Sequence, residues 1–84
     1  MNAKKKLTLG ERLRRERKNL NWSQDQLARE IGTSALSINR WEHDKTIPRP
    51  YYRRQLCRVF NISAEALFNL QDDEESEILE LPSI

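Results

Sequence analysis

The stretch from Gln24 to Trp41, QDQLAREIGTSALSINRW, constrains this 84-residue chain more than any other feature. Its apolar residues recur at helical spacing on both sides of one glycine, which predicts two short helices joined by a tight turn. Ala28 is small enough for the helices to cross closely, and Gly32 can adopt the positive φ that the turn needs. The apolar residues that would hold the two helices are Leu27, Ile31, Ile38 and Trp41.

This combination of a small residue, a turn glycine and apolar anchors is typical of a helix-turn-helix motif. The alternative is an ordinary αα-hairpin whose helices pack together only for stability. Several requirements are met together at fixed spacing, and this favours the helix-turn-helix.

Capping patterns predict where the helices begin. Thr8 followed by Glu11 has the pattern of a capping box, in which each side chain satisfies the other residue's backbone N–H. Ser23 and Gln26 repeat this pattern at the start of a second helix. Further helices are expected from Ser34 through Glu42, from Pro50 or Tyr51 to Phe60, and after Ser63. On the first helix, the residues expected to face the core are Leu9, Leu13 and Leu20.

We therefore expect a compact all-α domain of five helices over residues 8–70, between a basic arm (1–7) and an acidic tail (71–84). No apolar run approaches the ~18 residues needed to cross a membrane, and no signal-peptide pattern is present. Cys57 is the only cysteine and has no internal disulfide partner, which suits a reducing, cytoplasmic compartment. His43 is the only histidine and lies on a different helix from Cys57, so we expect no metal site. No serine, cysteine or threonine has a plausible base and orienting group, and no glycine-rich phosphate loop is present, so we expect no cofactor and no enzymatic activity.

The charge is divided unevenly along the chain. All 15 Lys and Arg residues but only 7 of the 13 acids lie within residues 1–70, whereas the last 14 residues carry 6 acids and no base. A basic body of this kind suggests a polyanionic partner, although a merely solvated surface explains the charge equally well. The lysines Lys4 to Lys6 are either an arm that reaches phosphates or a solubilising tail.

The third expected helix has two different faces. With Ile38 at zero and about 100° per residue, Trp41 and Ser34 face the core, and Leu36 and Arg40 face away. Ala35 and Asn39 lie on its flank, and His43 also faces away. This outward face has no acid, and its residue types suit base edges in a DNA major groove. Leu36 could instead pack against a tail.

Two opposite charges fall on faces that should be buried. Arg17 lies within about 40° of Leu13 on the first helix, and Glu42 lies within about 40° of Ile38 on the third. Pairing between them explains both positions best, and the alternative is that each long side chain reaches solvent separately. We therefore predict a partly buried Arg17–Glu42 salt bridge between the two helices.

From Leu9 to Phe68 the chain resembles the Cro/CI-type (XRE) helix-turn-helix family, which has the lambda repressor-like fold. The matching elements are Ser23-Gln24, Leu27-Ala28, Ile31-Gly32, Ser37-Ile38, Trp41-Glu42 and Pro48. The resemblance implies five helices and binding to operator DNA, usually as a two-fold homodimer. It also implies a salt bridge at the Arg17 and Glu42 positions.

The resemblance assigns DNA-binding roles by motif position. Gln24 would lie close to the phosphate backbone. The recognition positions would be Thr33, Ser34, Ala35, Leu36, Asn39 and Arg40, and the phosphate-facing loop would contain Lys45, Thr46 and Arg49. The chain departs from the family at three other positions. Asp44 and Asn61 replace frequent glycines, and Arg53 stands where many members have an apolar residue.

The sequence therefore predicts a transcriptional regulator, a repressor, that binds double-stranded DNA through residues 34–42. The alternative is an antitoxin-type or adaptor module, or the DNA-binding end of a larger regulator. In that case the short apolar cluster Ile78–Leu81 in the tail would contact a protein partner.

Overall fold

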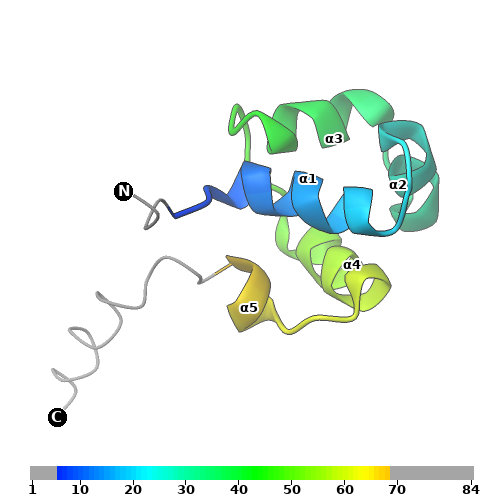
Figure 1. Cartoon of the computed structure of the whole chain (residues 1–84). Coiled ribbons are helices and arrows are strands. Elements are labelled where there is room, and N and C mark those ends of the chain that lie inside the picture. The colour runs from blue at the N-terminus through cyan, green and yellow to red at the C-terminus, as the bar shows by residue number, and fades with distance from the viewer. Residues whose placement is uncertain (1–5, 69–84) are drawn as a thin grey trace, which may run out of the picture.

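The computed structural model describes residues 6–68, and all the regular secondary structure in this part is helical (Figure 1). The helices are α1 (Leu9–Asn19), α2 (Gln24–Ile31), α3 (Ala35–Glu42), α4 (Pro50–Phe60) and α5 (Ala64–Phe68). The predicted all-α, five-helix fold is confirmed. None of these helices is long and apolar enough to cross a lipid bilayer. The acidic tail and most of the basic arm lie outside the described residues.

The N-terminal caps follow the sequence closely, with one difference. Thr8 Oγ1 accepts from the backbone N of Glu11 at 3.1 Å, and the Glu11 carboxylate accepts from the backbone N of Thr8 at 3.0 Å. Ser23 Oγ likewise accepts from the backbone N of Gln26 at 3.0 Å. The Gln26 side chain, however, donates to Glu30 at 3.0 Å instead of returning to Ser23, so this predicted capping box forms only in half.

Leu20 lies outside the core, contrary to the prediction. α1 ends at Asn19, and Leu20 forms its C-cap with 40% of its surface exposed. Asn21 then takes a positive φ of 61°, which turns the chain toward α2. Helical periodicity stops at the helix end, so it gives the wrong direction for a residue beyond it.

The core lies where all five helices meet. α1 packs against α3 and α5, α2 packs against α3 and α4, and α4 also contacts α5. In Figure 1, α1 crosses the domain between α3 above it and α4 and α5 below it. All four predicted anchors of the two central helices are buried. The core consists of Leu13, Leu27, Ala28, Ile31, Ile38, Trp41, Leu56, Phe60 and Leu67.

Gly10 allows α1 and α3 to approach each other at the level of their backbones. A Cβ atom at this position would lie 2.4 Å from the carbonyl oxygen of Glu42 and 2.5 Å from that of Trp41. Real side-chain carbons do not come this close to backbone atoms. The absence of a side chain at Gly10 therefore sets the distance between α1 and the end of α3.

The contacts of Asp44 explain why this position carries aspartate where the family often has glycine. Its φ is +59°, a left-handed conformation that a non-glycine residue rarely adopts. Its carboxylate accepts from Thr8 Oγ1 at 2.7 Å and from the backbone N of Gly10 at 2.9 Å. A carboxylate at a helix N-terminus satisfies free N–H groups and interacts favourably with the helix dipole. Asp44 therefore ties the segment after α3 to the start of α1.

Arg53, which stands where many family members have an apolar residue, lies exposed on the surface of α4. Its Nε donates to the carbonyl oxygen of Pro48 at 3.1 Å, and its guanidinium lies 5.7 Å from the centre of the Phe68 ring. The neighbouring Tyr52 is half-buried, with its ring 5.5 Å from that of Trp41. An apolar residue is not required at position 53, because Tyr52 makes the inward contact.

Candidate nucleic-acid interface

The turn between α2 and α3 follows from Gly32 and Ser34. Gly32 is left-handed, with φ 82° and ψ 39°, and its N–H and that of Thr33 both donate to the carbonyl oxygen of Ala28, at 2.8 and 2.9 Å. Ser34 then begins α3, and its Oγ accepts from the backbone N of Ser37 at 3.1 Å. The turn therefore sets the angle at which α3 leaves α2.

Ser34 is exposed, whereas the helical wheel placed it toward the core. As the N-cap of α3 it has an extended backbone, with φ −105° and ψ 157°, so the 100° step between helical residues does not apply to it. Ser34 is therefore exposed at the N-terminal end of α3.

α3 has the two faces that the sequence predicts. Ile38 is 1% exposed and Trp41 is 6% exposed, so both belong to the core. Leu36 is 56% exposed and Arg40 is also exposed, while Ala35 and Asn39 are half-buried on the flank. More than half of the Leu36 surface is left uncovered by residues 6–68. The described structure therefore leaves one side of α3 open along its length.

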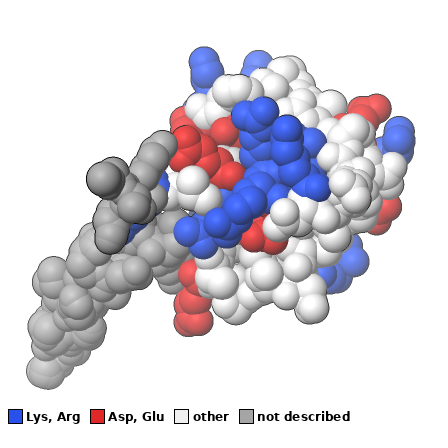
Figure 2. All heavy atoms as spheres, in the orientation of Figure 1, with Lys and Arg blue, Asp and Glu red and all other residues white. Residues whose placement is uncertain are grey.

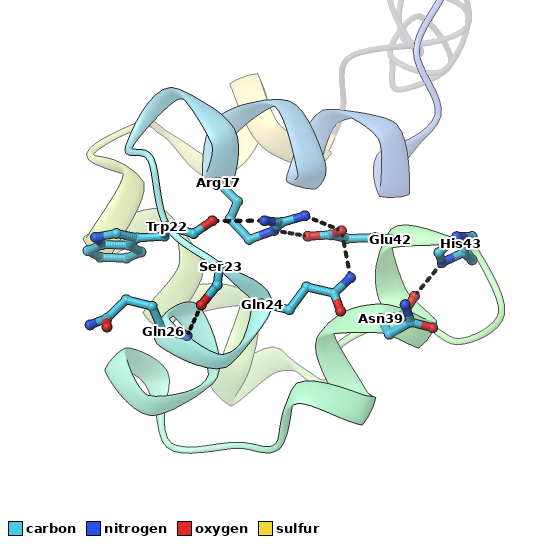
Figure 3. Close-up of polar contacts among 8 residues, drawn as sticks. All are labelled: Arg17, Trp22, Ser23, Gln24, Gln26, Asn39, Glu42 and His43. Atoms are coloured by element: carbon cyan, nitrogen blue, oxygen red, sulfur yellow. Dashed lines mark hydrogen bonds and ion pairs between the residues drawn. The ribbon is translucent and has the colours of Figure 1, made fainter.

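His43 closes the C-terminal end of α3. Its Nδ1 lies 2.9 Å from the backbone carbonyl oxygen of Asn39, as Figure 3 shows, and its side chain is exposed. Among residues 6–68, no three His, Cys, Asp or Glu side chains are grouped so that they could hold a metal ion. Cys57 on α4 is partly buried, and desolvation by this burial raises the pKa of its thiol.

Arg17 and Glu42 form the predicted salt bridge between α1 and α3 (Figure 3). Arg17 Nε donates to Glu42 Oε2 at 2.6 Å, and Nη2 donates to Oε1 at 3.0 Å. Arg17 Nη1 donates to the carbonyl oxygen of Trp22 at 2.8 Å. The side chains are only 9% and 1% exposed, so two charges held away from water are compensated by a bidentate contact.

Gln24, the first residue of α2, joins this salt bridge. Its Nε2 donates to Glu42 Oε1 at 3.1 Å, and the side chain is half-buried (Figure 3). The sequence placed Gln24 near the DNA backbone, and it did not predict the contact with Glu42. An amide has a second N–H and a carbonyl oxygen, so this contact leaves Gln24 able to bind another group.

The segment between α3 and α4 carries the three residues expected at the phosphate backbone. Lys45, Thr46 and Arg49 are all exposed, and their side chains make no hydrogen bond or ion pair within residues 6–68. Pro48 between them is fully buried, and the Lys45 N–H donates to the carbonyl oxygen of Arg40 at 2.9 Å. The backbone is therefore held while the polar side chains remain available.

The roles of two residues that position this surface were not predicted from the sequence. Gly10 sets the approach of α1 to α3, and Asp44 joins the N-terminus of α1 to the segment after α3. A signal existed for each. Glycine inside a helix costs stability unless close packing requires it, and an Asp at an expected glycine position suggests that its carboxylate has a role.

Comparison with known proteins gives consistent results. A family model described as "Helix-turn-helix domain" matches residues 10–73. The HTH-type transcriptional regulator DicA of Escherichia coli (strain K12) is 34% identical over 79 residues, which are 93% of this chain. The chain spans only 58% of the length of that regulator.

Solved structures agree with this family. The P22 c2 repressor in complex with synthetic operator 9T matches with a TM-score of 0.72 and 30% identity, over 75% of this chain and 96% of that one. The solution structure of the P22 c2 DNA-binding domain matches with a TM-score of 0.69 and 30% identity, over 75% and 83% of the two chains. The chain belongs to the helix-turn-helix domain family and has the lambda repressor-like fold.

Proposed function

We propose that this chain is a transcriptional regulator, a repressor, that recognises a DNA sequence by inserting α3 into the major groove. The observation that carries the proposal is the exposed side of α3, where Leu36 and Arg40 project from a helix whose other side is buried. A major groove is about 12 Å wide and admits one α-helix. Membership of the helix-turn-helix family and the likeness to a repressor bound to operator DNA support the same function.

Two groups of residues would divide the work. The N-termini of α2 and α3 would favour phosphate groups, because their free N–H groups and dipoles attract anions. Contacts to phosphates position a protein on DNA without reading its sequence. The residues assigned to this positioning role are Gln24, Lys45, Thr46 and Arg49.

The second group would read base edges. The methyl group of Ala35 and the side chain of Leu36 can contact thymine methyl groups, Asn39 can bridge an adenine edge, and Arg40 can bind guanine. Thr33 and Ser34, which directly precede α3, would complete this group. Arg17 and Glu42 would contribute indirectly, by holding α3 against α1 at a constant angle.

A homodimer completes the proposal. Two copies related by a two-fold axis would place their α3 helices about 34 Å apart, which is one turn of DNA. Repression would then follow from occupation of a two-fold operator.

Selection of preferred sites from a random DNA pool, followed by affinity measurements at several salt concentrations, tests these roles. Arg40→Ala should weaken binding to the selected site by about 5- to 150-fold and reduce the preference for it over random DNA. Lys45→Ala should weaken binding to all sequences alike and reduce the salt slope by about 0.9. Arg54→Ala, an exposed position on α4 outside both groups, serves as the control. Identical behaviour of the Arg40 and Lys45 variants would contradict the division of roles.

A further inference from the structure

α1 carries a basic surface on the side turned away from the core. With Leu13 at zero, Arg14, Arg15 and Lys18 fall at about 100°, 200° and 140° around the helix. All three are exposed, and together we call them the α1 basic surface. Figure 2 shows Lys and Arg side chains gathered on the face of the molecule that α1 crosses in Figure 1.

These three charges have almost no partners in the described structure. The side chains of Arg14 and Lys18 make no hydrogen bond or ion pair within residues 6–68. Arg15 contacts only its neighbour Glu16, at 3.4 Å. Like charges crowded on one helix face repel one another, so an acidic partner would stabilise this surface.

The α1 basic surface is separate from the proposed DNA-reading surface. Gly10, Leu13 and Arg17 are buried on the side of α1 that packs toward α3, at about 60°, 0° and 40° on the same wheel, whereas the α1 basic surface is exposed. None of the residues assigned to DNA contacts lies on α1. An uncovered basic surface here would attract DNA of any sequence, which is unfavourable for a sequence-specific protein.

The last described helix, α5, packs against the helix that carries this surface. Arg12 Nη1 on α1 donates to the carbonyl oxygen of Ala66 on α5 at 3.0 Å. Residues 71–84 contain six acids and no base. At about 3.3 Å per residue, position 72 lies within about 13 Å of residue 68 along an extended chain, and Arg14 to Lys18 span only about 6 Å of α1.

We propose that the acidic segment 71–77 binds the α1 basic surface of its own chain and neutralises it. Exposed ion pairs are individually weak, but the covalent connection holds the two partners at a high effective concentration. The contact leaves α3 uncovered. The contact between the tail and α1 should reduce binding to random DNA more than binding to the operator. This consequence rests on the proposed function.

Carbodiimide cross-linking of the full chain without DNA tests the contact itself. It joins Lys18 to a carboxylate only when the two are in direct contact. Peptide mapping of the monomer should find Lys18 linked to acids within residues 72–77 at low salt. The link should be lost at about 1 M salt, where the screening length is about 3 Å. Lys45 is the matched control, because it is equally an exposed lysine on the described domain.

Three results of this experiment would overturn the proposal. Links to Lys45 in preference to Lys18 would place the acidic segment on the proposed DNA surface. Equal linking of all lysines would show no binding site, and links found only between molecules would place the segment on a second copy. Because no DNA is present, the outcome does not depend on the proposed function.

A charge-neutral tail then tests the consequence for DNA. Neutralisation by Asp72→Asn, Asp73→Asn, Glu74→Gln and Glu75→Gln should raise the affinity for random DNA about tenfold at low salt. The same change should have no effect when Arg14, Arg15 and Lys18 are all replaced by Gln, because coupled groups are not additive. Replacement of Arg29, Arg54 and Arg58 by Gln is the matched control and should preserve the tail effect. An equal tail effect in both backgrounds would contradict the proposal.

Discussion

The two sides of α3 differ in how strongly the rest of the protein constrains them. On the inward side, Ile38 and Trp41 fill the core, and the Glu42 carboxylate is held by Arg17 and Gln24. On the outward side, Leu36 and Arg40 are exposed. The inward side therefore determines how the helix sits, while residues on the outward side can change with little effect on folding.

The largest expected effect is on the inward side. Glu42→Ala leaves the buried guanidinium of Arg17 without its counter-charge, so the free energy of unfolding should fall by about 3–5 kcal/mol. Urea denaturation monitored by circular dichroism measures this change. Glu30→Ala, at an exposed acid on α2, is the control and should change stability by less than about 0.5 kcal/mol. An unchanged denaturation midpoint for Glu42→Ala would show that the salt bridge is not buried.

Gly10→Ala should have the next largest effect. Replacement of glycine by alanine inside a helix normally stabilises a protein by about 0.5–1 kcal/mol. Here the new methyl group would meet two backbone carbonyl oxygens of α3, so we expect a loss of about 1–3 kcal/mol. The sign of the change in the free energy of unfolding, measured by urea denaturation, distinguishes the usual stabilisation from the expected clash. A gain in stability would mean that α1 and α3 can separate without cost.

Asp44→Gly tests the cap that joins the two helices. Glycine removes the strain of a left-handed residue, but the substitution also removes the carboxylate that accepts from Thr8 and Gly10. The loss of a cap typically costs about 1 kcal/mol, so the net effect should be destabilising. Asn61→Gly is the matched control, since Asn61 is also left-handed and is only a helix C-cap. It should leave the thermal midpoint unchanged or raise it, and the same response from Asp44→Gly would exclude the capping role.

The smallest expected effect on stability is on the outward side. Leu36→Ala should change the free energy of unfolding by no more than about 0.5 kcal/mol, because the side chain is exposed. It should still weaken binding to the selected DNA site. A loss of stability above about 2 kcal/mol would show that Leu36 is covered in the folded protein, and the contrast between the two sides of α3 would then fail.

The sequence predicted those features that depend on local spacing or on a whole helix face. Caps at Thr8, Ser23 and Ser34 involve residues three positions apart, and the Arg17–Glu42 pair follows from two charges on apolar faces. The errors at Leu20 and Ser34 arose where helical periodicity was extended beyond a helix end. The directions of these two side chains follow only from the backbone conformation at the helix ends.

The residue types at Gly10 and Asp44 indicate that each has a structural role, but the partners that they contact could not be predicted in this way. Asp44 binds a backbone N–H group 34 positions earlier in the chain, and Gly10 touches the backbone of another helix. Such contacts depend on how complete helices pack, and no local pattern encodes that packing. The exposure of Leu36 and Arg40 was predictable, whereas the base that each one reads depends on the geometry of a complex.

The position of the Glu42 carboxylate also has a consequence for how the domain opens. It accepts hydrogen bonds from Arg17 on α1 and Gln24 on α2, while Arg17 also holds the carbonyl of Trp22 in the connection between them. Separation of α1 from α3 would break the ion pair, and separation of α2 would remove the Gln24 hydrogen bond from the Glu42 carboxylate. Amide hydrogens in α1, α2 and α3 should therefore exchange with solvent in a single cooperative event, as one folding unit.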